Sequence, residues 1–194
     1  MISAPFISSP SSYICNKSML SGTFPTRLIY AIAKTLLKKG DMENVANYRP
    51  ISLLTLFSKV FEKIIYDTLL KHIKTNNILA VEQFGFRTSL TEKASYKLND
   101  DLLNAPNNRM MVGGIFCDLQ KAFNCVNHNI LLKKLEFYGI TGITYKLIKF
   151  YLQGRYQRVV LNNHSSSSCS NWGEITHSVP QGSILGPLLF STLY

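Results

Sequence analysis

The feature of the sequence that most constrains the fold is a regular apolar pattern between Leu56 and Ile73. Its apolar residues recur at intervals of three and four, as they would on one side of a helix: Phe57, Val60, Phe61, Ile64, Ile65, Leu69 and Ile73. The positions between them hold charged residues: Lys59, Glu62, Lys63 and Lys71. The pattern predicts an amphipathic helix with its apolar side in a core and its charged residues on the opposite face.

Length and composition narrow the class of protein. A chain of 194 residues with 46% hydrophobic content can bury a sizeable core, which argues against a disordered protein. Its formal net charge is +10. A charge of this sign favours an anionic partner, most simply nucleic acid. A basic protein without such a ligand is the alternative, because net charge does not show whether the charges cluster.

Cysteine spacing and the N-terminus indicate where such a protein would reside. Cys15, Cys117, Cys125 and Cys169 form no CxxC pair and have no paired histidines, so we interpret them as reduced thiols of an intracellular protein without a zinc site. No apolar run has the length of a membrane span, and the first residues lack the pattern of a signal peptide. Residues 1–21 are rich in Ser and Pro and are predicted to be a loop or the remnant of a longer region.

The remaining elements are predicted from apolar runs and the turn residues between them. Strands are expected at 28–33, 156–161 and 172–179, with a polar hairpin loop at 162–170. Helices are expected at 130–138 and 143–152. A further helix at 90–103 should stop before Pro106, because proline lacks the amide hydrogen that a helix interior needs.

One carboxylate stands in an unusual sequence context. The apolar run 115–117 is typical of the end of a buried strand, and Asp118 follows it directly. A carboxylate among apolar neighbours is costly to bury unless a cation or several donors meet it. Phe123 lies five residues later, where the backbone is expected to turn away, so a metal-dependent nucleotide site is one interpretation. Taken alone, however, an Asp at this position is more often a helix cap or turn former.

Three basic residues are further candidates for binding an anion. Lys38 belongs to a turn at 38–41, and Pro50 holds Arg49 in an extended conformation, so both could converge on a polyphosphate. For each of them taken singly, solvated surface charge is the better explanation. In the segment 83–87, two phenylalanines flank a glycine and Arg87 follows, an arrangement that can contact a nucleic-acid strand. A tight turn with a packed phenylalanine pair explains that segment nearly as well.

Four motifs occur in a fixed order along the chain. They are Asn-Tyr-Arg-Pro-Ile-Ser-Leu-Leu at 47–54, Gln-Phe-Gly-Phe-Arg at 83–87, Asp118 through Phe123, and Val-Pro-Gln-Gly-Ser at 179–183 with Leu-Gly-Pro at 185–187. Together they resemble the reverse transcriptase domain of non-LTR retrotransposons of the LINE-type, jockey-like group. The resemblance covers roughly residues 22–194. It implies an α+β right-hand polymerase fold, of which this chain would supply the fingers and the first part of the palm, with an antiparallel sheet packed on helices.

The resemblance also implies a role for individual residues. Asp118 matches the catalytic, metal-binding aspartate of a two-Mg²⁺ site, which holds the attacking 3′-oxygen and the leaving pyrophosphate. Residues expected to contact the incoming nucleotide are Lys38, Arg49, Phe123, Gln181 and Gly182, and Arg87 is expected on the template side. The implied partners are an RNA template, a DNA primer and a deoxynucleoside triphosphate, with no membrane and no stable protein partner. The implied location is the cytoplasm and nucleus.

The chain departs from the family pattern in several places. Family members usually have Asp where this chain has Asn124, Pro where it has Thr35, and Gly where it has Ser178. The Tyr/Phe-Ala-Asp-Asp motif, which carries further metal-binding carboxylates, does not occur among the 194 residues. We therefore expect a fragment or a decayed copy of a mobile element. Two hypotheses remain: an RNA-directed DNA polymerase domain, incomplete as given, or a non-catalytic remnant that still binds nucleic acid.

Overall fold

The structure is a computed structural model, and it describes residues 4–87, 90–119, 121–162 and 167–193. Its α-helices are α1 (Ala4–Ser21), α2 (Leu56–Thr75), α3 (Leu90–Asn107), α4 (His128–Phe137), α5 (Gly142–Leu152) and α6 (Leu185–Ser191). Its strands are β1 (Tyr30–Leu37), β2 (Tyr48–Leu53), β3 (Arg155–Asn162), β4 (Ser167–Cys169) and β5 (Gly173–Ile175). Short 3₁₀ helices are η1 (Thr26–Leu28), η2 (Val45–Asn47) and η3 (Ala122–Cys125). The chain is thus α+β, as predicted.

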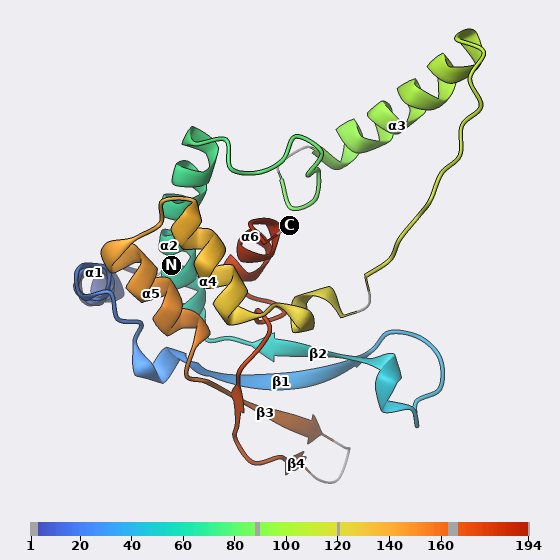
Figure 1. Ribbon diagram of the computed structural model, residues 1–194. Coiled ribbons are helices and arrows are strands. Elements are labelled where there is room, and N and C mark those ends of the chain that lie inside the picture. The colour runs from blue at the N-terminus through green and yellow to red at the C-terminus, as the bar shows by residue number, and fades with distance from the viewer. Residues whose placement is uncertain (1–3, 88–89, 120, 163–166, 194) are drawn as a thin grey trace.

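The strands form one mixed sheet with the order β2-β1-β3-β4, and β5 also pairs with β3. Strand β1 runs antiparallel to β2 and parallel to β3, whereas β3 pairs antiparallel with β4 and β5. The prediction of an antiparallel sheet is therefore wrong for the β1–β3 pair. Helices separate these two strands in the sequence, and a chain that crosses over in this way can return in the parallel direction. Figure 1 shows the helices gathered on one side of the sheet.

The core lies between that side of the sheet and the packed helices. Helix α2 contributes Phe61, Ile65, Leu69 and Ile73, which repeat at intervals of four and are buried. Leucines of α4, α5 and α6 complete the same cluster. Helix α2 begins after Thr55, whose Oγ1 accepts a hydrogen bond of 3.1 Å from the backbone N–H of Ser58. That cap and the apolar repeat explain why the sequence pattern located this helix correctly.

The side of α2 that is buried differs from the predicted one. Phe57 and Val60 were expected in the apolar stripe, but both are exposed. Glu62 was expected on the charged face, yet 0% of its surface is exposed. The buried face is rotated toward Ser58 and Glu62 because α5 and α6 approach the helix from that side. Periodicity alone could not show this, since the position of the neighbouring helices decides which edge of a wide stripe is covered.

Residues 4–21 are helical, so the loop predicted for this part of the chain is wrong. Helix α1 packs against α5 and buries Cys15 and Ser18, and this burial outweighs the unfavourable Ser and Pro composition. Pro10 lies within the helix. Gly22 ends it with φ +69°, and the Gly22 N–H donates to Ser18 O at 2.9 Å. An added Cβ at Gly22 would lie 3.0 Å from Ile143 O, so glycine also permits the close packing.

Helix α3 and the segment after it project from the body, as Figure 1 shows. The helix continues through Pro106 to Asn107, slightly past the predicted end, because a proline in the last turn removes only one helical hydrogen bond. Residues 110–119 are extended without being a strand. Ile115 and Phe116 are 93% and 87% exposed, so the predicted buried strand before Asp118 is wrong. Strand formation needs a partner, and no described strand pairs with this segment.

The C-terminal elements agree with prediction in part. Strand β3 and helices α4 and α5 lie at the expected positions, whereas the strand expected at 172–179 is reduced to β5, followed by an isolated bridge between Asn127 and His177. Part of the predicted hairpin loop at 162–170 lies outside the described residues. Among the helices that the structure describes, none combines the length and apolar character needed to cross a membrane.

Candidate functional site

The β1–β2 hairpin brings together two of the predicted nucleotide-binding residues. Arg49 on β2 lies opposite Leu36 on β1, and Lys38 follows two residues after Leu36. Because side chains alternate along a strand, Lys38 and Arg49 extend from the same face of the hairpin. The Lys38 N–H donates to Asn47 O at 2.8 Å, which continues the ladder past the end of β1. Both side chains are exposed and available to an anion.

The loop Pro180–Ser183 is fastened to the same hairpin. The Ser52 N–H donates to Gln181 O at 2.8 Å. Gly182 has φ +106°, and a Cβ at this position would lie 3.0 Å from Ser52 O. Glycine is therefore required both by the backbone conformation and by the close approach to β2. Ser52 is three residues from Arg49, so at the rise of a strand the loop lies roughly 10 Å from Arg49 along β2.

Phe123 lies in η3 beside the strand-like segment that leads into this loop. Its backbone oxygen accepts a hydrogen bond of 3.1 Å from the Val179 N–H. The ring is half-buried, with its centroid 4.9 Å from that of Phe190 and 5.7 Å from that of Phe86. Phe123 is thus bonded to a residue that lies two positions before Gln181 in the sequence. The same contacts also give it a packing role, in which its ring packs against Phe86 and Phe190.

Asp118 is not brought to a cluster of carboxylates. Its side chain is exposed in the extended segment. Among the described residues, no group of three or more His, Cys, Asp or Glu side chains is placed to hold a metal ion. Asn124, where the family has Asp, is exposed in η3. The described residues therefore supply one predicted metal ligand and do not by themselves form a two-metal site.

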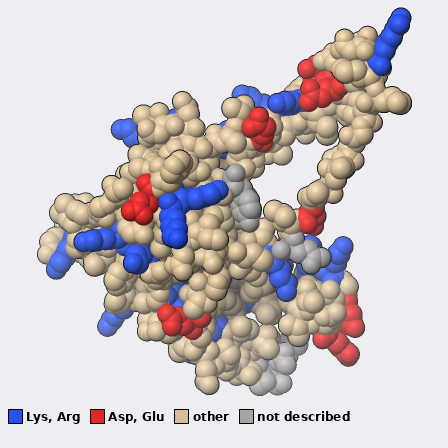
Figure 2. Space-filling view, viewed as in Figure 1, with Lys and Arg blue, Asp and Glu red and all other residues tan. Residues whose placement is uncertain are grey.

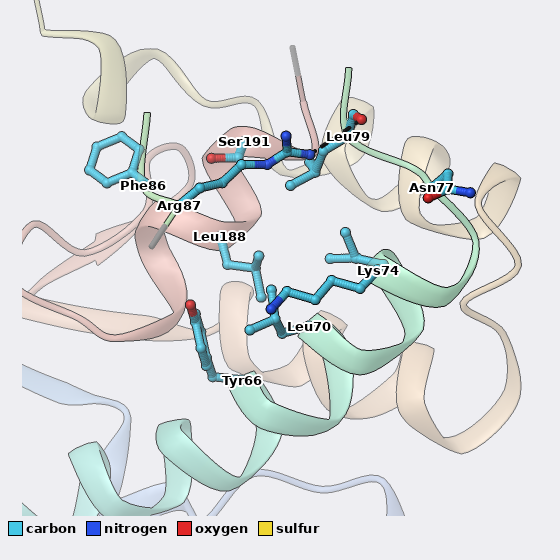
Figure 3. Close-up of a pocket in the computed structure, with 10 residues that line it drawn as sticks. Tyr66, Leu70, Lys74, Asn77, Leu79, Phe86, Arg87, Leu188 and Ser191 are labelled. Carbon is cyan, nitrogen blue, oxygen red and sulfur yellow. Dashed lines mark hydrogen bonds between the residues drawn. The ribbon is translucent and has the colours of Figure 1, made fainter. Parts of the chain in front are cut away.

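Arg87 lines a cavity of about 300 Å³ between α2, the segment 77–87 and α6 (Figure 3). Tyr66, Leu70 and Leu188 form an apolar wall, and Lys74 adds a second cation. The Arg87 guanidinium donates to Leu79 O at 3.4 Å, a long contact that holds the side chain over the cavity. Arg87 is separate from the hairpin that carries Lys38 and Arg49, so the predicted template contact belongs to another part of the molecule.

The solvent face of the sheet carries an aromatic cluster that the sequence reasoning missed. Tyr30 on β1 stacks on Tyr156 of β3, with ring centroids 5.5 Å apart and planes 20° from parallel. Trp172 meets Tyr30 edge-on at 5.1 Å, and the Arg158 guanidinium lies 4.8 Å from the centre of the Trp172 ring. The alternation of Tyr156 and Arg158 along one strand was the pattern in the sequence that could have indicated part of this cluster. Only the parallel pairing reveals that Tyr30 joins them.

The charges around this aromatic cluster are mostly positive. Lys34 and Arg49 extend from the same face of β1 and β2, and Glu174 lies opposite Tyr156 on β5. The helical side of the molecule is also basic: Figure 2 shows blue lysine side chains over α4 and α5, where Glu136 contributes one acidic group among Lys133, Lys134, Lys146 and Lys149. The net charge of the chain is therefore spread over several faces.

A second feature that the sequence did not reveal is a buried polar cluster beneath the loop. Glu62, Tyr151 and Arg155 are each 0–1% exposed. The Tyr151 hydroxyl donates to Glu62 Oε1 at 3.0 Å, and the Ile184 N–H donates to Glu62 Oε2 at 2.7 Å. The Arg155 guanidinium lies 4.8 Å from the centre of the Tyr151 ring, and its nitrogens have no hydrogen-bond partner among the described residues.

Burial dominates the electrostatics of this cluster. It raises the pKa of Glu62, an effect that the Ile184 N–H, the Arg155 charge and the Tyr151 hydroxyl partly oppose. Burial also raises the pKa of Tyr151. His128, at the start of α4, donates from Nε2 to Ser178 O at 2.7 Å, and burial lowers its pKa. The three groups are held by hydrogen bonds and are shielded from solvent.

Comparison with known proteins identifies the family. The sequence profile described as "Reverse transcriptase (RNA-dependent DNA polymerase)" matches residues 36–194. The chain belongs to the reverse transcriptase family. It is 34% identical over 169 residues to a probable RNA-directed DNA polymerase from transposon X-element of Drosophila melanogaster, a match that covers 86% of this chain and 18% of the relative.

Two further relatives give the same result. The chain is 34% identical over 177 residues to a probable RNA-directed DNA polymerase from transposon BS of Drosophila melanogaster, covering 87% of the chain and 18% of the relative. It is 32% identical over 180 residues to the RNA-directed DNA polymerase from mobile element jockey of Drosophila funebris, covering 92% and 19%. The predicted resemblance to non-LTR, jockey-like retrotransposon polymerases is confirmed. The reverse transcriptase chain described here spans about a fifth of the length of these curated relatives.

Proposed function

We propose that this chain provides the nucleotide-binding part of an RNA-directed DNA polymerase, which transfers a nucleotide from a deoxynucleoside triphosphate to a primer 3′-hydroxyl on an RNA template. The observation that carries the proposal is the hydrogen bond between Ser52 N and Gln181 O, which fixes the loop 180–183 beside the strand that bears Arg49. This bond supports the proposal, because Lys38 and Arg49 belong to the hairpin and Gln181 and Gly182 to the loop that is bonded to it. In the right-hand polymerase fold the hairpin belongs to the fingers, and η3 with α6 belongs to the palm.

Each side chain has a defined task in this site. Lys38 and Arg49 bind the triphosphate, because exposed ammonium and guanidinium groups on one face can neutralise several phosphate oxygens. Gln181 and Gly182 contact the nucleotide and template, where the missing side chain of Gly182 lets the backbone approach closely. Phe123 lies beneath the sugar and leaves too little space for a 2′-hydroxyl, which selects deoxynucleotides by a steric clash.

Asp118 would be one carboxylate ligand of a Mg²⁺ site, and Mg²⁺ would supply charge stabilisation at the reacting phosphate. Among the described residues, Asp118 belongs to no group of three or more potential metal ligands. We expect the 194-residue chain to give no primer extension on an RNA template. Extension that persists in an Asp118→Ala variant would remove Asp118 from this role.

A binding experiment tests the nucleotide site directly. Equilibrium dialysis with a labelled deoxynucleoside triphosphate should show binding by the wild-type chain and at least a tenfold loss in the Arg49→Ala variant, since one charged hydrogen bond contributes about 1.5–3 kcal/mol. Lys71→Ala is the matched control, because Lys71 is also exposed but lies on α2, away from the hairpin. Equal losses in the two variants would indicate a non-specific charge effect and contradict the site.

The solvent face of the sheet supports the second half of the proposal, binding of a single-stranded template. Aromatic rings beside cations are the usual platform for unpaired bases and phosphates. Trp172 is the single tryptophan of the chain, so its fluorescence reports on this face. Titration with an RNA oligonucleotide should change that fluorescence, with an affinity that falls as salt rises. Binding without any change at Trp172 would place the template elsewhere, with the cavity at Arg87 as the next candidate.

The alternative function is a nucleic-acid-binding remnant without catalysis. The isolated position of Asp118 favours it, whereas the ordered hairpin and loop favour the polymerase. The two are separated by the dialysis experiment, because a remnant needs no nucleotide site and would bind RNA while failing to bind the triphosphate.

A further inference from the structure

Glu62 occupies a position that packing alone does not explain. It belongs to α2, yet its carboxylate is 0% exposed beneath the loop 180–183. A buried carboxylate costs free energy unless hydrogen-bond donors and positive charge compensate it. An apolar residue of similar size would fill the same space without that cost. The contacts of the carboxylate therefore indicate what it contributes.

The two carboxylate oxygens serve two different elements. Oε1 accepts the hydroxyl of Tyr151 on α5, and Oε2 accepts the backbone N–H of Ile184 at 2.7 Å. Ile184 directly follows the loop and precedes α6. The bond to Ile184 is the shorter of the two, 2.7 Å against 3.0 Å. Glu62 thus fastens the C-terminal end of the loop to α2.

The other part of the loop is held by the same stretch of chain. Gln181 accepts from the N–H of Ser52, and Thr55 caps α2 three residues later. Ser52 and Glu62 therefore lie on one continuous strand–cap–helix segment, which also carries Arg49. A loop that is attached to both points cannot move relative to Arg49 unless one of these hydrogen bonds breaks.

We propose that Glu62 is a positioning residue, which fixes the loop bearing Gln181 and Gly182 relative to Arg49. The proposal rests on the proposed nucleotide site for its functional meaning. Glu62 is itself buried and does not touch the nucleotide. It acts through the N–H of Ile184, and this gives it an effect that a purely structural residue of the core would not have: local control of one loop.

Two substitutions separate positioning from packing. In Glu62→Gln, the side-chain oxygen can still accept from Ile184 and the amide can donate to the Tyr151 oxygen, so both contacts survive. In Glu62→Leu, the volume is similar but neither contact exists. Amide hydrogen exchange of the full 194-residue chain should be about ten- to a hundredfold faster at residues 182–186 in Glu62→Leu. It should remain close to wild type in Glu62→Gln, and α4 and α5 should be unchanged in both.

Tyr151→Phe is the matched control, since it removes the other donor and leaves the Ile184 contact intact. Because the Tyr151 hydroxyl also interacts with Ser183 in the loop, amide exchange there should rise less than in Glu62→Leu. Unchanged loop exchange in Glu62→Leu, or equal acceleration in α4 and α5, would overturn the proposal. If Glu62→Leu does not fold, amide exchange in the wild-type protein tests the proposal. The Ile184 amide must then exchange as slowly as the amides of α6. Rapid exchange at Ile184 would contradict the hydrogen bond to Glu62.

Nucleotide binding by the same variants keeps the two proposals distinguishable. Weaker binding of a deoxynucleoside triphosphate by Glu62→Leu, with recovery in Glu62→Gln, supports both. If the exchange pattern is as expected but the wild-type chain binds no triphosphate, Glu62 still positions the loop and the nucleotide role of the loop is wrong. If the triphosphate binds equally well to all variants, positioning by Glu62 has no bearing on the site and the inference fails.

Discussion

The hairpin with its attached loop and the segment that ends at Asp118 belong to the same predicted site, but they are held in place by different means. The loop 180–183 is bonded to β2 and α2 and lies over the core. Residues 110–119 run from α3 back to the body with exposed apolar side chains and no strand partner among the described residues (Figure 1). The comparison teaches that neighbouring elements hold the predicted nucleotide-binding residues in place, whereas the predicted metal ligand Asp118 lies on a segment that pairs with no described strand.

The largest difference between the two regions should appear in stability. Leu135 on α4 is 0% exposed, whereas Ile115 is 93% exposed. Leu135→Ala should lower the free energy of unfolding by about 2–5 kcal/mol, because it leaves a cavity in the core. Ile115→Ala should change it by about 0.5 kcal/mol or less. Urea denaturation measures both, and similar losses would show that the segment 110–119 is packed in solution.

Alanine substitutions that test backbone strain should give a smaller difference in stability between the loop 180–183 and the segment 110–119. Gly182→Ala places a Cβ 3.0 Å from Ser52 O at φ +106° and should cost about 1–3 kcal/mol. Gly113→Ala is the control in the extended segment, since a Cβ there meets nothing within 4 Å. Thermal denaturation of both variants is the test. A harmless Gly182→Ala would mean that the loop is not pressed against β2.

Ser178, just before the loop, offers a change in the opposite direction. Its φ of +86° is unfavourable for any residue with a Cβ, and the family resemblance implies glycine at this position. Ser178→Gly should therefore stabilise the protein by about 1 kcal/mol, since the strain relieved exceeds the added freedom of the unfolded chain. Ser95→Gly, on the exposed surface of α3, should destabilise. If both substitutions destabilise, the strained conformation at Ser178 is not the one that the protein adopts.

The smallest expected effect is a pH dependence that belongs to the anchored region alone. Burial lowers the pKa of His128 below its usual 6.5, with His177 and Arg155 adding to the decrease and Ser178 O opposing it. Below pH 6.5 the unfolded state therefore binds a proton that the folded state does not, and stability should fall as the pH drops through this range. His128→Gln should flatten this part of the profile in urea denaturation at several pH values. An unchanged profile would assign the acid sensitivity to other groups.

The sequence predicted an element correctly where the residues that stabilise the element lie within or next to it. Helix α2 was predicted from its apolar repeat, and the Thr55 cap that the structure shows lies next to the same segment. The sequence did not predict burial or secondary structure correctly where contacts with a distant element determine them. Glu62 is buried because α5 and α6 approach its side of the helix, and α1 is helical because α5 covers it. The aromatic cluster of Tyr30 and Trp172 likewise depends on a strand order that periodicity cannot provide.

The residues of the candidate site also differ in how far the sequence could predict their positions. Lys38 and Arg49 were predicted from a turn and a neighbouring extended segment, and the β1–β2 hairpin brings them to one face. Phe123 and Gln181 were placed by family resemblance, and the Val179–Phe123 hydrogen bond brings their segments together. The strand before Asp118 was predicted from its apolar character, which promotes pairing but does not supply a partner. Whether these residues act as the resemblance implies stays a prediction for each of them.

The parallel pairing of β1 with β3 bears on how the chain acquires this structure. Tyr30 meets Tyr156, so two strands of one sheet join only after more than a hundred intervening residues exist. Contacts between such distant residues slow folding, because the entropy cost of closing a long loop comes before the contacts that offset it form. On a ribosome, the β1–β2 hairpin would be complete long before its second neighbour emerges. Until then β1 has an unpaired edge, which makes the nascent hairpin a natural substrate for chaperones and a point at which synthesis speed can influence the yield of folded protein.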